Sequence, residues 1–224
     1  GFETVTYLLD GRMRHEDSAG NSGELNPGDV QWMTAGRGII HCEEPHEEFL
    51  KTGGRTHGFQ IWVNLPSSHK MMEPRYQEVP STESPVVEKD GVWARVIAGE
   101  CMGTTSSIDT KIPITLIHVK MKPESRLVQK LQEDLNGMIY VFGGGINLEN
   151  ETRVKKSPIA FGIGAKQGIQ DGELALLSEG EEIVIESQEG AEFLIFAGPE
   201  LNEPIERYGP FVMNTKEEIH QAFS

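Results

Sequence analysis

The sequence predicts an all-β protein of two tandem β-barrels or sandwiches, with one short helix at its C-terminal end. Three observations predict this fold class. Short segments rich in β-branched and aromatic residues recur between turns of Gly, Pro, Asn and Asp. The two halves also match, because Tyr7 and Phe59 are about 52 residues apart, and so are Tyr140 and Phe193. Helical spacing of apolar residues occurs only in the C-terminal tail.

The first half contains strands separated by glycine-containing turns. Residues 3–11 end at an Asp-Gly turn, and with the next segment, through His15, they predict a β-hairpin. Two further strands are expected, one that ends at Trp32 and one that carries His41. A polar loop is expected at residues 44–54. In residues 59–65 apolar and polar residues alternate, which predicts a half-buried strand.

The predicted organisation has four parts. Prolines at positions 66, 74, 80 and 85 suggest a connector between two domains. We expect a first domain at 1–66, the connector at 67–91, a second domain at 92–214 and a helix at 215–224. Thr215 is the expected helix N-cap, with Glu218 three positions later. Strands of the second domain are expected at 92–98, 114–121, 137–145, 175–177, 182–186 and 193–197.

Composition limits the classes of partner. The net charge of −15 gives no basic stripe for binding a phosphate backbone, so direct nucleic-acid binding is not expected. No apolar run reaches the ~20 residues of a membrane span, and the first residues do not resemble a signal peptide. Two cysteines far apart indicate no disulfide framework. We expect a monomeric cytoplasmic protein, with a nuclear location as a further expectation, and the start at Gly1 within a strand-like pattern suggests a fragment of a longer protein.

The segment most informative about function is residues 26–43, which ends with a histidine and a glutamate two positions apart. On a strand, His41 and Glu43 share one face while Cys42 points to the other, as two ligands of one metal ion would require. The pair alone is also compatible with an ordinary exposed strand end. A catalytic non-haem iron usually has at least three protein ligands, so two residues do not complete a site.

The longer motifs resemble those of the pirin family, which belongs to the cupin superfamily. The resemblance covers nearly the whole chain and rests on four segments, residues 1–11, 15–18, 28–41 and 209–215. Pirins are bicupins, so the resemblance implies two cupin-type β-barrels. The internal repeat, which rests on spacing alone, indicates the same two-barrel organisation.

The resemblance implies a non-haem Fe2+ in the N-terminal barrel, held by a His-x-His pair, one further histidine and one glutamate. The last two ligands correspond to His41 and Glu43, so two of the four are present, and the His-x-His pair would lie before Gly1. The apparent truncation implies weak metal binding in this chain. In the second barrel Ser125 to Lys130 stand where a His-x-His would be expected, which implies a structural repeat without metal.

Three functions follow as alternatives. The first is a quercetin 2,3-dioxygenase activity of the intact parent protein, with Glu43 as the candidate general base for the hydroxyl of a flavonol. The second is an iron-dependent, redox-sensitive transcription coregulator that binds a transcription-factor protein. The third is a truncated paralogue without metal, kept for its fold or for a partner.

Other polar residues have plainer interpretations. Glu3 is either a partner of a metal ligand or a strand residue. His15, with Asp17 and Ser18, is expected to have a structural role, and His57 is expected in a loop. His118 is expected to be a hydrogen-bonded core histidine.

The remaining candidates are apolar or glycine-rich. Cys42 is expected to be a small buried residue. Residues 143–145 follow a strand but precede no Lys-Ser/Thr, so a turn or bulge is favoured over a phosphate loop. Core positions are expected for Trp32, Met33, Phe59 and Trp62, one or two of which could border a pocket for a flat aromatic substrate.

Overall fold

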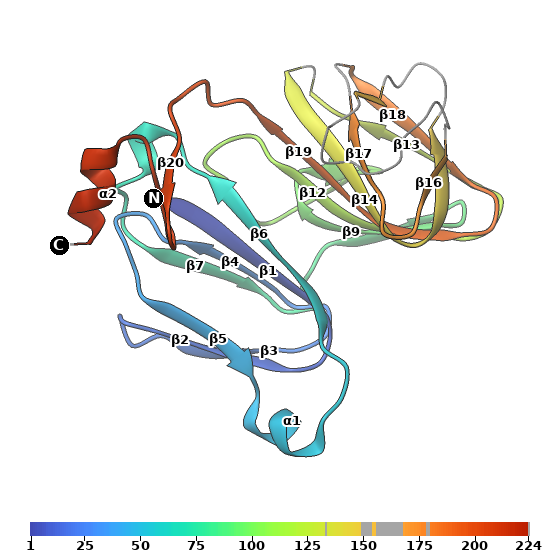
Figure 1. Ribbon diagram of the computed structural model, residues 1–224. Helices are drawn as coiled ribbons and strands as arrows, with labels where there is room; N and C mark the ends of the chain where they lie inside the picture. Colours follow the sequence, from blue (N-terminus) through green and yellow to red (C-terminus); the bar gives the residue numbers. More distant parts are fainter. Residues whose placement is uncertain (133, 149–153, 156–167, 178–179, 224) are drawn as a thin grey trace. The chain divides into compact units, whose positions relative to one another are not determined.

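The computed structural model describes residues 1–132, 134–148, 154–155, 168–177 and 180–223. Its contacts divide the chain into two compact units, Gly1–Ser84 with Leu201–Ser224, and Pro85–Glu200. Antiparallel strands dominate both units (Figure 1). The predicted all-β class is therefore confirmed.

One sheet of the first unit has four antiparallel strands in the order β6-β1-β4-β7. Because side chains alternate along a strand, Thr4 and Thr6 lie on one face of β1 and Glu3 on the other. Thr4 pairs with Met33 and with Trp62, so these three side chains share a face. The strands are β1 (Phe2–Asp10), β4 (Val30–Thr34), β6 (His57–Asn64) and β7 (Arg75–Val79).

A second, three-stranded sheet of this unit faces the first (Figure 1). Its order is β3-β2-β5, with bounds β2 (Met13–Asp17), β3 (Ser22–Leu25) and β5 (His41–Pro45). His15 pairs with Glu43, and Asp17 pairs with His41. These four polar side chains therefore share one face of the sheet.

The hairpin expected from residues 3–11 and the segment through His15 is wrong. Strand β1 pairs with β4 and β6, whereas β2 pairs with β3 and β5 in the other sheet. Between them, Gly11 has a φ of 95°, a backbone conformation that glycine adopts readily. The chain does turn after Asp10, as predicted, but a turn does not specify that the strands on its two sides pair with each other.

Residues 44–54, expected to be a loop, contain the helix α1 (Glu47–Thr52). The side chain of His46 accepts a hydrogen bond from the Glu48 backbone N–H, and the first turn is acidic while Lys51 stands in the last. None of the helical residues is buried. The helix therefore depends on capping and charge, and it lacks the apolar periodicity that usually predicts one.

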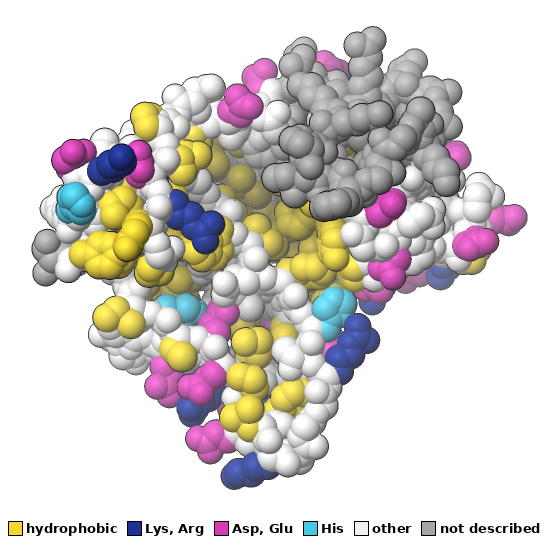
Figure 2. Space-filling model, viewed as in Figure 1, with side chains coloured by type: hydrophobic (Ala, Val, Ile, Leu, Met, Phe, Trp, Pro, Cys, Tyr) yellow, Lys and Arg dark blue, Asp and Glu magenta, His cyan; other side chains and the backbone are white. Residues whose placement is uncertain are grey.

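The predicted C-terminal helix is confirmed as α2 (Lys216–Ala222), with Thr215 and Glu218 forming a capping box. A short 3-10 helix, η1 (Ser67–His69), and a hairpin of β20 (Glu206–Tyr208) and β21 (Phe211–Met213) also belong to this unit. Apolar side chains gather over α2 and β20 (Figure 2). In the described part of the chain, no helix has the length and apolar character of a membrane span.

The second unit is built around a ten-stranded sheet, whose main path is β13-β18-β14-β19-β12-β9-β8. A separate two-stranded pair is formed by β10 (Glu100–Cys101) and β11 (Thr104–Thr105). The large sheet contains β8 (Val86–Lys89), β9 (Val92–Ala98), β12 (Thr115–Met121), β13 (Ser125–Lys130), β14 (Leu135–Leu148), β15 (Val154–Lys155), β16 (Gly168–Gln170), β17 (Leu174–Leu177), β18 (Glu182–Ser187) and β19 (Ala191–Pro199).

The core of the second unit is a cluster of buried aliphatic side chains around Phe193. Phe193 is fully buried and pairs with Val119 on one side and with Val141 on the other. Beyond Val141 the register of β14 shifts by one residue, which is a β-bulge at the start of residues 143–145. The interpretation of this glycine run as a turn or bulge is thus confirmed.

The internal repeat is visible in the strand pairing. The segments at Tyr7 and Phe59 lie on β1 and β6, which pair with each other, and those at Tyr140 and Phe193 lie on β14 and β19, which also pair. Both pairs are antiparallel. Equivalent positions of the two halves therefore form equivalent antiparallel strand pairs.

The observed division of the chain differs from the expected one in two places. Within the expected connector, residues 75–79 form β7 and complete the four-stranded sheet of the first unit. Residues 201–214, assigned above to the second domain, lie with the first unit. The density of prolines suggested a linker. The prolines at 74 and 80, however, flank β7 and do not interrupt it.

The second unit is expected to lose stability in acid through Glu192. His118, which is buried as predicted, lies with Nε2 2.9 Å from Glu192 Oε1, and that hydrogen bond, with one from Lys120, lowers the pKa of Glu192 to about 2. A carboxylate with a lowered pKa stabilises the folded state above its ordinary pKa and loses this contribution as pH falls from about 4.5 toward 2. Urea unfolding at several pH values should show this loss, and Glu192→Gln should reduce it; an unchanged pH dependence would contradict the assignment.

Candidate metal centre

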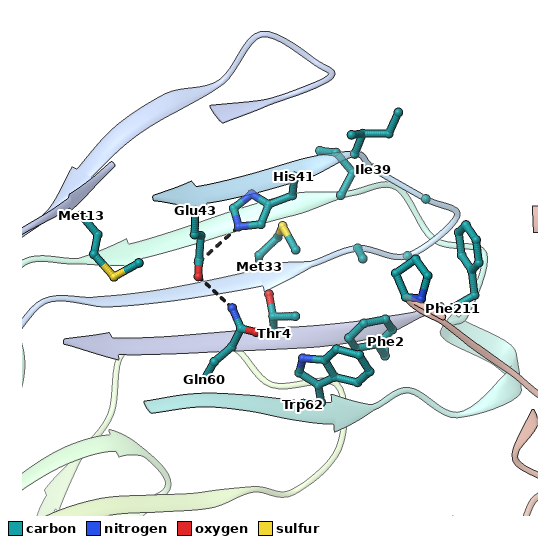
Figure 3. A pocket seen from close by; sticks show the side chains of 16 residues that line it. Phe2, Thr4, Met13, Met33, Ile39, His41, Glu43, Gln60, Trp62 and Phe211 are labelled. Carbon is teal, nitrogen blue, oxygen red and sulfur yellow. Dashed lines mark hydrogen bonds and ion pairs between the residues drawn. The ribbon is translucent and has the colours of Figure 1, made fainter. Parts of the chain in front are cut away.

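His41 and Glu43 lie side by side on β5 and point toward each other into a cavity (Figure 3). His41 Nε2 is 3.2 Å from Glu43 Oε1, and their side chains are only 12% and 9% exposed. The structure therefore brings together the two residues that the alternation of side chains placed on one face. An ordinary exposed strand end does not describe this pair.

Both carboxylate oxygens of Glu43 are held by the opposite sheet of the same unit. The hydroxyl of Thr6, on β1, donates to Oε1 at 2.7 Å, and Gln60 Nε2, on β6, donates to Oε2 at 2.7 Å. Burial alone would raise the pKa of Glu43, but the interactions with His41, Thr6 and Gln60 outweigh it and the pKa is lowered. Glu43 is therefore a carboxylate at neutral pH, in one fixed orientation.

The second ring nitrogen of His41 faces Tyr76 on β7. His41 Nδ1 is 3.3 Å from the Tyr76 hydroxyl, which also hydrogen-bonds Asp17. Burial and the neighbouring carboxylates raise the pKa of Tyr76. Desolvation would raise the pKa of Asp17, but hydrogen bonds from Asn21 and Tyr76 lower it to about 2. Both ring nitrogens of His41 thus face polar groups of fixed position.

The cavity beside the pair has a volume of about 510 Å³, within the range of small-molecule sites. One wall is aromatic, with the rings of Phe2 and Trp62 4.6 Å apart between their centroids. Arg207 lies 4.9 Å from the centre of the Trp62 ring. The lining residues labelled in Figure 3 are Phe2, Thr4, Met13, Met33, Ile39, His41, Glu43, Gln60, Trp62 and Phe211. The expectation that aromatic or methionine residues border a pocket holds for Met33 and Trp62.

The donor set fits a divalent transition metal. An imidazole nitrogen and a carboxylate oxygen are ligands that non-haem iron accepts. His41 Nε2 is buried and has no aligned hydrogen bond among the described residues, as a nitrogen with a lone pair reserved for a metal would be. No cluster of three or more His, Cys, Asp or Glu with metal-binding geometry occurs in the described part of the chain, and the sequence contains no His-x-His pair. The chain therefore supplies two converging donors.

Glu3 does not point into this cavity. It is fully buried on the face of β1 opposite Thr4 and Thr6, and it accepts a 2.6 Å hydrogen bond from the Thr34 hydroxyl. Of its two interpretations, the structure therefore favours a strand residue over a partner of His41 or Glu43.

Two other histidines of the first unit lie outside the donor pair. His15 is 2% exposed, with Nε2 2.9 Å from Glu78 Oε1, and its ring stacks on Tyr76. His57 lies at the start of β6, where Nδ1 is 3.0 Å from Arg55 Nη2, and it does not line the cavity. The loop expected for His57 is thus a strand.

The expectation for Cys42 is wrong. It does point away from Glu43, but it is exposed, because the outer face of the β3-β2-β5 sheet is open to solvent at this position. Cys101 of the second unit is the buried one. Period-two alternation predicts the face of a residue but not whether that face is covered.

Sequence reasoning missed the partners of the pair, which are Thr6, Gln60 and Tyr76. Thr6 and Gln60 stand on strands that were recognised, on the faces that alternation assigns to them. Tyr76 lies on a strand that was taken for a connector. Residues 75–79 lie between two prolines and include Tyr76 and Val79, which are residue types enriched in strands, and this was the signal that could have revealed it.

Comparison with known proteins decides the family. The family model described as Pirin matches residues 1–63, and that described as the Pirin C-terminal cupin domain matches residues 116–224. Human pirin is 42% identical over 99% of this chain and 72% of its own length. The chain belongs to the pirin family.

Other members of the pirin family and its structural relatives have names that suggest an activity. A Pseudomonas aeruginosa protein whose name proposes quercetin 2,3-dioxygenase activity is 40% identical over 99% of this chain and 74% of its own length. The crystal structure of a quercetin 2,3-dioxygenase from Acinetobacter baumannii matches all of this chain and 73% of that one, with a TM-score of 0.88 and 36% identity. The cupin-type fold and the two-barrel organisation of pirins are therefore confirmed for this chain.

Proposed function

We propose that this pirin is a metal-dependent dioxygenase of the quercetin 2,3-dioxygenase type, with Fe2+ held in part by His41 and Glu43. The observation that carries the proposal is the convergence of these two donors beside a cavity of about 510 Å³ with an aromatic wall. Names of relatives in the family support the reaction class. When bound, Fe2+ would supply Lewis acidity and a redox centre for dioxygen.

The residues of the chain would bind and orient a flavonol and accept its proton. The apolar and aromatic lining around Trp62 suits a flat ring system. Glu43 would take the proton of the 3-hydroxyl on a carboxylate oxygen, as a general base. Because Thr6 and Gln60 fix both oxygens, the carboxylate needs no reorganisation when substrate enters.

The experiment is aerobic turnover of quercetin by the Fe2+-loaded protein, expressed from its complete coding sequence. We expect His41→Ala to reduce kcat/KM by at least about 100-fold, because it removes a metal donor. The matched control His57→Ala removes an imidazole outside the cavity and should keep the activity. No turnover by the loaded wild type, or equal turnover by His41→Ala, would contradict the proposal.

A second candidate function is binding of a transcription-factor protein, with Fe2+ as a redox-sensitive regulator. The observation that favours a protein partner over DNA is the net charge of −15. On the face shown in Figure 2, Lys and Arg side chains stand in separate small groups without a continuous basic stripe. Binding to defined transcription-factor domains in the ferrous and ferric states is the test, and no binding in either state would count against it.

The third alternative, a paralogue without metal, is separated from the other two by metal analysis. Elemental analysis of the protein from its complete coding sequence should show bound iron if either of the first two functions holds. Protein that neither retains nor takes up a divalent metal would favour the third.

A further inference from the structure

Asp17, Tyr76 and His41 form a chain of side-chain hydrogen bonds that ends at the candidate metal centre. Asp17 stands directly opposite His41 on the neighbouring strand, and Tyr76 reaches both residues from β7 of the facing sheet. The Tyr76 hydroxyl hydrogen-bonds the carboxylate of Asp17 and is 3.3 Å from His41 Nδ1. One hydroxyl therefore connects the carboxylate to the ring.

The direction of these hydrogen bonds follows from the surroundings of Asp17. Three N–H donors already point at its carboxylate, from the backbone of Ala19 and from the backbone and side chain of Asn21, at 2.7–2.9 Å. A carboxylate in such surroundings is an acceptor. A tyrosine hydroxyl has a single hydrogen, so Tyr76 donates it to Asp17 and has only its oxygen lone pairs left for His41.

The consequence for His41 is a fixed tautomer. Both ring nitrogens face an oxygen, but Nδ1 makes a hydrogen bond with the Tyr76 oxygen, whereas Nε2 makes no aligned one with Glu43, so we assign the hydrogen to Nδ1. The neutral ring then has its lone pair on Nε2, which is the buried nitrogen 3.2 Å from Glu43 Oε1 without an aligned hydrogen bond. The lone pair of His41 Nε2 and the carboxylate oxygen of Glu43 therefore face each other, in position to bind a cation.

The geometry points to Tyr76 and Asp17 as positioning residues that hold His41 in its Nδ1–H form, with Nε2 ready for a metal ion. This inference rests on the proposed function only in assuming that the ion binds at His41 and Glu43. Metal-bound histidines commonly donate their other N–H to a fixed acceptor, and removing that acceptor typically weakens metal binding about 10–100-fold.

The other groups near His41 do not offer Nδ1 an alternative. The His15 ring centre is 6.0 Å from that of His41, and the His15 imidazole pairs with Glu78. Glu43 faces the other ring nitrogen. Tyr76 is thus the polar partner that the described residues give to His41 Nδ1.

The first measurement is the tautomer itself, from 15N NMR shifts of the His41 ring in the full chain after metal removal. At about pH 8.5, roughly two units above the ordinary histidine pKa, the wild type should show a protonated Nδ1 and an unprotonated Nε2. Tyr76→Phe removes the acceptor and should shift population toward the Nε2–H form, where Glu43 becomes the acceptor. The control Tyr208→Phe removes an exposed hydroxyl of the same unit and should change neither shift.

The second measurement is calorimetric titration with Ni2+, an air-stable ion that imidazole binds well. We expect the Kd to rise at least about tenfold in Tyr76→Phe and to stay unchanged in Tyr208→Phe. Circular dichroism should confirm that the variants fold. If Tyr76→Phe does not fold, Asp17→Asn provides the second variant, since it should also weaken the preference for Nδ1–H.

The outcomes separate this inference from the proposed function. An Nε2–H ring in the wild type, or ring shifts unaffected by Tyr76→Phe, would overturn the tautomer assignment. The expected tautomer with an unchanged Ni2+ affinity in Tyr76→Phe would overturn its role in metal binding. Both expected results in a protein that does not consume quercetin would support the positioning role while removing the dioxygenase proposal.

Discussion

Replacing Glu43 by glutamine is expected to weaken divalent-metal binding by more than about 100-fold, beyond the loss typical of residues that only support a ligand. The substitution preserves size but removes the charge. It also replaces one carboxylate oxygen by an amide NH2, so at least one of the hydrogen bonds now accepted from Thr6 and Gln60 is lost or reversed. Calorimetric titration with Ni2+ would measure the loss.

Glu44→Gln is the matched control for Glu43→Gln. Glu44 is the next residue on β5 and points to the opposite face, where it pairs with Arg14 at 3.0 Å and is 46% exposed. Exposed ion pairs contribute little to stability, and the position faces away from the cavity. Its Ni2+ affinity should equal that of the wild type. Equal losses in both variants would show that the overall negative charge of the protein, and not the pair His41 and Glu43, attracts the ion.

Replacing Phe193 by alanine is expected to destabilise the second unit by about 3–5 kcal/mol. The ring is fully buried in the centre of the aliphatic cluster, between Val119 and Val141 on the neighbouring strands. Removing it leaves a cavity that paired strands on both sides cannot close. Urea unfolding followed by circular dichroism would measure the change in the unfolding free energy.

Phe223→Ala is the same substitution at an exposed position. Phe223 follows α2, is 58% exposed, and makes edge contacts with Tyr208 and Phe211. Aromatic pairs of this kind contribute about 0.5–1.5 kcal/mol each, so a smaller loss is expected. If Phe193→Ala destabilised the protein no more than Phe223→Ala, the cluster around Phe193 would not be the core of the unit.

Local patterns in the sequence predicted what depends on neighbouring residues. The alternation of side chains placed His41 and Glu43 on one face, and the structure has them 3.2 Å apart. The Thr215 to Glu218 spacing predicted a capping box, which is present. The glycine run after Val141 predicted a turn or bulge, and the register shifts there. In each case a few adjacent residues determine the geometry.

The features that were not predicted depend on partners distant in sequence. Nothing within residues 3–15 specifies that β1 pairs with β4 and β6 while β2 joins another sheet. Tyr76 acquires its role only because β7 pairs with β4, which brings it to His41 across 35 positions of the chain. Exposure of Cys42 likewise depends on whether another layer covers its sheet. Such long-range pairing is a tertiary property that local propensity does not encode.

The most direct test of the central claim is a crystal structure of the full-length protein soaked with Ni2+, with the ion located by its anomalous scattering. We predict a single strong peak in the first unit, bonded to both His41 Nε2 and a carboxylate oxygen of Glu43. A peak elsewhere, or none at a Ni2+ concentration that saturates binding in solution, would contradict the account.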